Sequence, residues 1–370
     1  MPGIIPTGGW GFTWGNGPTW DSVCVNLPYF IYKFTGDVSV IEENIVMIMN
    51  YLRYIYSTKD EQGLITRGLG DWVDPFKTER GYIASPLAFT ESAMVYDMAS
   101  KASFLFEKIL RKKEADYAKA IAAEMRTNIR KHLIDEETML VAGNCQTSQA
   151  VALEIGLFEE NELLEARNRL IEIIHHDGDI NACGMLGLRY VFHALVHAGE
   201  ADLAYKIITS EARSCYGYWL KNGATTLWED FPDLNVHAGS SKNHYFLGDI
   251  SSLFIQEFAG LKPNPNACNI HYFEISPHFI SALQYAEASY MSPFGTVNVR
   301  WERNDDKIKL RVNVPKGIEG KIILPENYRF CNVNAASLSD NTMLLSENSE
   351  IICSIIKTKK TVQKIRIVRS

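Results

Sequence analysis

The sequence lacks several features that would place the chain in a specialised class of protein. Its seven cysteines are odd in number and scattered, and none forms a Cys-x-x-Cys pair or the Cys/His spacing of a zinc site. Neither a disulfide scaffold nor a structural zinc site is therefore predicted, and the thiols are expected to be reduced and mostly buried. The cysteines are Cys24, Cys145, Cys183, Cys215, Cys268, Cys331 and Cys353.

Long apolar runs and blocks of basic charge are also missing. No stretch is apolar over the length that a bilayer requires, and the start of the chain has neither the charge nor the apolar run of a secretion signal. The net charge of -7 is spread along the chain, so no partner among nucleic acids or anionic membranes is predicted. We expect a cytoplasmic protein with a neutral or cationic ligand, and the sequence leaves its oligomeric state open.

Hydrophobic residues repeat with the period of an α-helix over the first two-thirds of the chain. Roughly nine such segments lie between residues 21 and 260, joined by short connections. The clearest one follows a candidate capping box of Ser39 and Glu42. Its apolar residues are Ile41, Ile45, Ile48, Leu52 and Ile55. Helices that follow one another as antiparallel hairpins are the building unit of an α/α barrel, which is the fold predicted here.

The period changes to strict alternation after the Leu261-Lys-Pro-Asn-Pro segment. Two alternating runs, 297–301 and 308–314, flank a turn and predict a β-hairpin. Further short strands are predicted at 321–324, 351–356 and 362–368. We therefore expect a mainly helical domain over residues 1–265 and a small antiparallel β-sandwich over residues 266–370.

Two long loops, 63–85 and 214–241, are rich in aromatic and acidic residues, and loops of this kind on a rigid scaffold usually carry function. Glu229 stands beside Trp228 and near Phe231, on a segment expected to lie outside the core. This pattern favours a pocket for a ring with one polar and one apolar face, such as a sugar. Glu229 could act as a general base toward an attacking water, or it could be a solvated surface acid.

Other candidates are His244, expected in the first turn of a helix that runs to Gly260, and Asp71 with Trp72 in a glycine-rich loop. His244 could hydrogen-bond a sugar hydroxyl or cap its helix. A loop tryptophan could stack on a sugar or be pinned to the scaffold. Three tryptophans lie close together in the sequence, Trp10, Trp14 and Trp20, and Asp21 follows the last. They could form an aromatic pocket wall or be an exposed remnant of a core. The pair His193 and His197 has no carboxylate third ligand on its segment, so no metal site is predicted.

These segments together resemble the catalytic domain of α-L-rhamnosidases, which form glycoside hydrolase family 78 in the six-hairpin glycosidase group. The most specific match is Ala-Thr-Thr-Leu-Trp-Glu at 224–229. The other matches are Gly-Pro-Thr-Trp-Asp at 17–21, Tyr-Lys-Phe-Thr-Gly-Asp at 32–37, Gly-Asp-Trp at 70–72, Cys-Gly-Met-Leu-Gly-Leu at 183–188, the run at 197–205, and Asn-His-Tyr at 243–245. The resemblance extends almost from end to end of the chain.

The resemblance implies an (α/α)6-type barrel followed by a C-terminal β-sandwich, and inverting hydrolysis of terminal α-L-rhamnosides without a metal or other cofactor. It places Glu229 at the general base of the family. It places Trp20 and Trp72 at ring-stacking positions and His244 at a sugar-hydroxyl contact, with Asp21 and Asp71 as adjacent substrate contacts. Trp228 joins this set as the aromatic neighbour of Glu229.

One departure from the family pattern concerns the general acid. The resemblance places this glutamate upstream of the Trp20 region, and residues 1–20 contain no acid. Six hairpins require twelve helices, whereas roughly nine are predicted. We therefore expect a barrel that is incomplete at its N-terminus, in a chain that begins partway through its fold and has weak activity or none by itself.

Two alternatives remain open at this stage. The first is a carbohydrate-binding relative that keeps the tryptophans but does not turn substrate over. The second is another α/α-barrel sugar hydrolase, such as an unsaturated uronyl hydrolase. That enzyme would need basic residues for a uronate carboxylate, and Arg67 and Arg80 are the only arginines in the two loops that carry Trp72 and Glu229.

Overall fold

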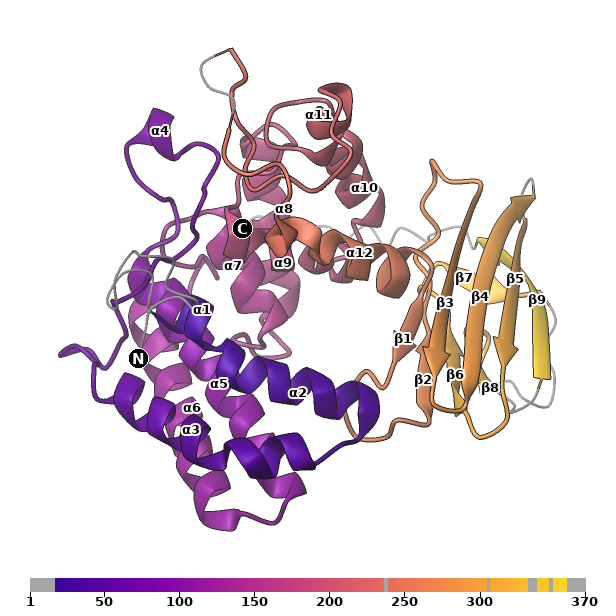
Figure 1. Cartoon of the computed structure of the whole chain (residues 1–370). Helices are drawn as coiled ribbons and strands as arrows, with labels where there is room; N and C mark the ends of the chain where they lie inside the picture. Colours follow the sequence, from indigo (N-terminus) through magenta and orange to yellow (C-terminus); the bar gives the residue numbers. More distant parts are fainter. Residues whose placement is uncertain (1–16, 236–238, 305–306, 332–337, 346–348, 358–370) are drawn as a thin grey trace, which may run out of the picture. The chain divides into compact units, whose positions relative to one another are not determined.

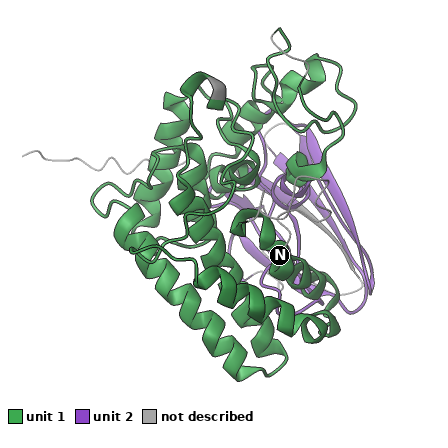
Figure 2. Ribbon diagram, turned by 60° about the vertical axis from the view of Figure 1, so that its left-hand side comes forward, with its two compact units in different colours: residues 1–250 green, residues 251–370 purple. Residues whose placement is uncertain are grey.

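A computed structural model describes the chain from residue 17 to residue 357, except residues 236–238, 305–306, 332–337 and 346–348. The chain divides into two compact units, one up to Ile250 and one from Ser251 (Figure 2). The predicted domain boundary after residue 265 stays a prediction. No helix in the described part of the chain is both long and apolar enough to cross a membrane.

The first unit is helical, as predicted (Figure 1). Its longer helices are α2 (Val23–Thr35), α3 (Ser39–Tyr56), α5 (Leu87–Lys108), α6 (Lys112–Leu133), α7 (Gln146–Glu154), α8 (Leu163–His176), α9 (Met185–His197) and α10 (Ala201–Thr209). Its shorter helices are α1 (Pro18–Asp21), α4 (Lys77–Arg80), α11 (Tyr216–Lys221) and the 3₁₀ helix η1 (Tyr245–Asp249). The loop predicted at 214–241 therefore contains one short helix, α11.

The predicted helical period is confirmed in α3. Ile41, Ile48, Leu52 and Ile55 are each 0–1% exposed, and Ile45 packs against the same core. This core is shared with α5 and α6, which lie side by side as an antiparallel hairpin (Figure 1). The apolar stripes of neighbouring helices face each other there, which is what an α/α hairpin requires.

The start of α3 differs from its prediction. The capping box of Ser39 and Glu42 is wrong, because the N-cap residue is Val38, whose side chain makes no capping hydrogen bond. Asp37 takes this role instead, since its Oδ1 accepts a hydrogen bond from the Ser39 N–H at 2.8 Å. An aspartate that bonds the backbone two residues onward satisfies one of the free donors at a helix start in the same way.

The helix predicted from the His244 region to Gly260 is present over residues 245–258, but it is not a regular α-helix. It consists of η1, α12 (Ile250–Leu253) and the π-helix η2 (Phe254–Phe258), which follow one another without a break. His244 is the N-cap residue of η1 and does not lie in a first helical turn. Its position is fixed by loop contacts described below.

The second unit contains two sheets, with strand orders β1-β2-β6-β8 and β3-β4-β5-β9-β7 (Figure 1). The strands of the first sheet are β1 (Leu261–Pro263), β2 (Tyr272–Ile275), β6 (Glu319–Ile323) and β8 (Thr342–Leu345). Those of the second are β3 (Tyr285–Ser292), β4 (Gly295–Asn304), β5 (Lys307–Val314), β7 (Tyr328–Phe330) and β9 (Ser349–Lys357).

The predicted antiparallel β-sandwich is confirmed, with one parallel pair between β2 and β6. The hairpin predicted from alternation is β4 and β5, in register with Trp301 opposite Leu310. Both side chains are fully buried, and the Trp301 indole N–H donates to the Phe258 carbonyl at 2.8 Å. The strands predicted at 321–324 and 351–356 correspond to β6 and β9, and the one at 362–368 lies outside the described residues.

A pair of substitutions on α3 tests the packing of the helical unit. Leu52→Ala removes a fully buried side chain and should lower the free energy of unfolding by about 2–5 kcal/mol, because it leaves a cavity. Val46→Ala on the same helix, at a position that is 72% exposed, should change it by less than about 0.5 kcal/mol. Urea unfolding followed by helical circular dichroism measures both, and equal effects would contradict the packing described here.

Candidate active site

Two segments of the 214–250 region run in opposite directions beside each other and hold Glu229 close to His244. The Glu229 N–H donates to the Ser241 carbonyl at 2.9 Å, and the His244 N–H donates to the Leu227 carbonyl at 2.9 Å. We call this pair of segments, residues 226–230 and 240–244, the Glu229 ribbon. It places two of the predicted site residues on one short piece of paired backbone.

The carboxylate of Glu229 is partly held by the ribbon itself. Its Oε2 accepts a hydrogen bond from the Ser241 N–H at 3.0 Å, which fixes the direction of the side chain. No other hydrogen bond of this carboxylate is found among the described residues, and the residue is half-buried. Oε1 is therefore available to accept a proton or a hydrogen bond from a ligand or a water molecule.

Aromatic rings connect the Glu229 ribbon to α1. The ring of His244 lies 4.5 Å from that of Phe246, edge to face, and the Phe246 ring lies 5.7 Å from the half-buried indole of Trp20. The Nδ1 atom of His244 accepts a long hydrogen bond of 3.5 Å from the Phe246 N–H. Trp20 and His244, which are far apart in the sequence, thus both lie close to the phenyl ring of Phe246.

Trp228 and Phe231 belong to the core, which corrects the expectation that their segment lies outside it. Each is 4% exposed. The Phe231 ring stacks on that of Trp219 at 4.6 Å, and the Trp228 ring lies 6.1 Å from Trp219. The ammonium group of Lys242 lies 4.8 Å from the Trp228 ring centre. Through Trp228, the cluster of Trp219, Trp228 and Phe231 anchors the Glu229 ribbon in the core. A substrate contact of Trp228 stays a prediction.

Asp71 is buried and fully occupied by protein donors. It is 1% exposed, and it accepts hydrogen bonds from the Gly184 N–H at 2.8 Å, the Gly187 N–H at 2.9 Å and the Thr147 hydroxyl. Burial raises its pKa to about 6, against the lowering effect of these bonds. Asp71 therefore fastens the 63–85 loop to the starts of α7 and α9, and a direct contact with substrate stays a prediction.

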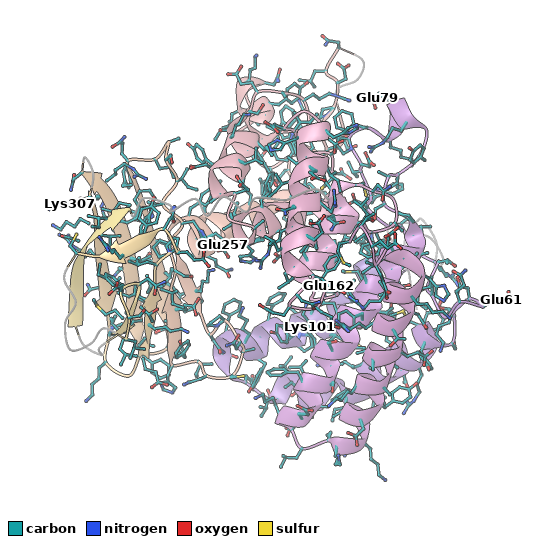
Figure 3. All side chains as sticks on the ribbon, turned by 180° about the vertical axis from the view of Figure 1, so that it is seen from behind. Glu61, Glu79, Lys101, Glu162, Glu257 and Lys307 are labelled. Atoms are coloured by element: carbon teal, nitrogen blue, oxygen red, sulfur yellow. The ribbon has the colours of Figure 1, made fainter. Side chains whose placement is uncertain are left out.

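Trp72, the neighbour of Asp71, is half-buried, and the Lys77 ammonium lies 5.0 Å from its ring centre. The far end of its loop is held as well. The buried Asp74 forms an ion pair with the part-buried Arg80. Glu79, which lies on α4 (Figure 3), accepts a hydrogen bond from Arg213, just before α11. The 63–85 loop is thereby attached to the segment that leads into the 214–241 loop.

Asp21 is 8% exposed, and its Oδ2 accepts hydrogen bonds from the Gly17 N–H at 3.0 Å and the Tyr51 hydroxyl at 3.2 Å. Burial raises its pKa. In this structure the carboxylate stabilises the turn that carries Trp20, and its predicted contact with substrate stays a prediction. Trp10 and Trp14 lie outside the described residues.

The two histidines of the i, i+4 pair have separate acidic partners. His197 Nδ1 lies 2.9 Å from Glu154 Oε1, and His193 Nε2 lies 3.5 Å from Asp249 Oδ2. Groups of three or more side chains suited to a metal ion are not found in the described part of the chain.

The family described as the bacterial α-L-rhamnosidase six-hairpin glycosidase domain matches residues 1–258, and the α-L-rhamnosidase C-terminal domain matches residues 270–337. The chain belongs to the bacterial α-L-rhamnosidase family. It is thus a relative of glycoside hydrolases, with the mainly helical region and the small β region that the resemblance implied.

Individual relatives agree with this assignment. The α-L-rhamnosidase of Alteromonas sp. (strain LOR) is 27% identical over 325 residues, which are 84% of this chain and 35% of that protein. One from Formosa agariphila is 25% identical over 344 residues, or 90% of this chain and 37% of that protein. The chain therefore spans about a third of the length of these relatives.

Solved structures share the fold. The α-L-rhamnosidase of Aspergillus terreus superposes with a TM-score of 0.82 at 20% identity, covering 95% of this chain and 41% of that one. The α-L-rhamnosidase of Streptomyces avermitilis, solved in complex with L-rhamnose, gives a TM-score of 0.78 at 21% identity, covering 91% of this chain and 33% of that one.

Sequence reasoning missed Glu91, a buried acid on α5 that bonds to both Trp-bearing segments. The Thr19 N–H donates to its Oε2 at 2.9 Å and the Gly70 N–H to its Oε1 at 2.8 Å. A signal was present in the sequence, since Thr90, Glu91 and Ser92 are three polar residues in succession within a largely apolar helix. Its partners could not be predicted, because both contacts join residues distant in the sequence.

The raised pKa of Asp71 predicts a measurable pH dependence. Its unfolded-state pKa is about 3.9, so the folded chain holds this proton more tightly. The resulting stability is fully present below about pH 4 and is lost as the pH rises through about 6. Relative to Asp71→Asn, the free energy of unfolding of the unaltered chain should fall by about 2–3 kcal/mol over this range. Urea titrations of both proteins at pH 4, 5, 6 and 7 measure the two free energies of unfolding. If the value for the unaltered chain minus that for Asp71→Asn stays constant or grows as the pH rises, the prediction is wrong.

Proposed function

We propose that the helical unit binds a terminal α-L-rhamnosyl residue and that Glu229 is the general base for its hydrolysis with inversion. The Glu229 ribbon carries this proposal, because it holds Glu229 and His244 together and brings them, through Phe246, next to Trp20. Membership of the α-L-rhamnosidase family supports the substrate class, and the relative from Streptomyces avermitilis was solved with L-rhamnose.

Each group matches one part of a sugar. Indole rings bind the C–H face of a pyranose, and Trp20 and Trp72 are both half-buried, so part of each ring stays accessible. The imidazole of His244 can donate to or accept from a hydroxyl group. The free Oε1 of Glu229 can take a proton from a water molecule as that water attacks the anomeric carbon.

The complete reaction also needs a general acid. Inverting hydrolysis uses two carboxyl groups about 6.5–9.5 Å apart, and the acid protonates the oxygen of the departing group. The resemblance places that acid upstream of the Trp20 region. A substrate whose departing group leaves without a proton removes this requirement, and it therefore isolates the role of Glu229.

α-L-Rhamnosyl fluoride is such a substrate, since fluoride departs as a stable anion. We expect the chain to hydrolyse it to β-L-rhamnose, and Glu229→Gln to lower kcat by about 10²–10⁴-fold with little change in KM. Asp230→Asn is the matched control, because it alters the adjacent acid, which bonds Ser240 instead. It should keep the rate within a few-fold.

Fluoride release and proton NMR of the first product measure the rate and the stereochemistry. Equal rates for Glu229→Gln and the unaltered chain would remove Glu229 from the role of base. Binding of L-rhamnose without any hydrolysis of the fluoride would instead identify a carbohydrate-binding relative.

A further inference from the structure

Glu91 lies at the meeting point of the two segments that carry Trp20 and Trp72, and the reaction proposed above does not use it. Its side chain is 0% exposed. One carboxylate oxygen accepts the N–H of Thr19, which directly precedes Trp20, and the other accepts the N–H of Gly70, two residues before Trp72. A single side chain is thus bonded to both backbone segments.

The two segments also approach each other more closely than side chains would allow. A Cβ atom added at Gly68 would lie 2.1 Å from the Glu91 Oε1 atom. A Cβ atom added at Gly17 would lie 2.5 Å from the Gly68 Cα atom. Glycine at both positions therefore allows the α1 turn and the 63–85 loop to contact each other beside the Glu91 carboxylate.

The buried position of Glu91 is unfavourable for an ionised carboxylate. Burial raises its pKa to about 7, and the nearby charge of Asp21 acts in the same direction, while the N–H groups of Thr19 and Gly70 oppose the shift. An apolar residue would occupy this position in α5 without that cost. What an apolar residue could not supply is an acceptor for two backbone N–H groups from two separate segments.

We propose that Glu91 is a positioning residue that sets the separation of Trp20 and Trp72 and thereby the affinity for the sugar. This inference rests on the proposed function, in which both indoles contact the rhamnosyl ring. Glu91 acts through the backbone of Thr19 and Gly70 and does not touch the substrate. A ring-stacking contact depends steeply on distance. A change in the distance between the Trp20 and Trp72 rings therefore weakens sugar binding even where the fold is kept.

Glu91→Gln tests the proposal with little change in shape. The amide nitrogen cannot accept a hydrogen bond, so one of the two N–H groups loses its acceptor. Isothermal titration with L-rhamnose should give a Kd about tenfold higher than that of the unaltered chain. Ser92→Ala is the matched control, because Ser92 is the next residue of α5, is equally buried, and accepts the N–H of Ile65 at 2.9 Å. Its Kd should stay within about twofold.

Gly68→Ala provides a second route to the same effect. The added methyl group displaces the Glu91 carboxylate without changing residue 91, so it should raise the Kd as Glu91→Gln does. Amide hydrogen exchange measured without sugar reports directly on the hydrogen bonds from Thr19 and Gly70 to Glu91. Glu91→Gln should speed exchange at Thr19 and Gly70, and Ser92→Ala should speed it at Ile65.

The outcomes separate this inference from the function on which it rests. If the unaltered chain does not bind L-rhamnose, the proposed function is wrong, and the role of Glu91 in sugar binding is wrong with it. If the unaltered chain binds, and Glu91→Gln and Gly68→Ala bind equally well, only the positioning role is overturned. Equal loss of affinity in Ser92→Ala would also overturn it, because a general loss of stability would then explain the effect.

Discussion

Buried carboxylates that accept backbone N–H groups hold the candidate site in shape. Glu91 joins the α1 turn to the 63–85 loop, and Asp71 joins the same loop to the starts of α7 and α9. Each of the first two segments holds only one four-residue helix, α1 or α4, so its position depends on such contacts. Burying an acid raises its pKa and costs free energy, and the N–H bonds offset part of that cost while they fix the geometry of the loops.

The helical scaffold and the loops have different tasks in this arrangement. The α3, α5 and α6 core supplies rigid, apolar packing, and α5 presents Glu91 from within that core. The Glu229 ribbon rests on an aromatic cluster and is linked to α1 by ring contacts. A site assembled from loops on rigid helices is the common arrangement for enzymes, because small changes in loops alter specificity while the scaffold is kept.

Local periodicity was sufficient to predict the helices and strands, but contacts between residues distant in the sequence determine how the site residues are arranged. The Ile41 to Ile55 spacing was sufficient for α3, and alternation was sufficient for the β4–β5 hairpin, because both signals lie within one element. The short pieces after His244, the burial of Trp228 and the two bonds of Glu91 depend on tertiary partners, which a local pattern does not contain. The family resemblance supplied the candidates, and the structure showed which of them are accessible and which are held inside.

A crystal structure of the chain soaked with L-rhamnose would locate the sugar relative to Glu229. We expect the sugar between Trp20 and Trp72, with a hydroxyl bonded to His244 and the Oε1 atom of Glu229 facing the anomeric carbon across one water molecule. Well-ordered density for these residues with no sugar at saturating L-rhamnose, or a sugar bound away from Glu229, would contradict it.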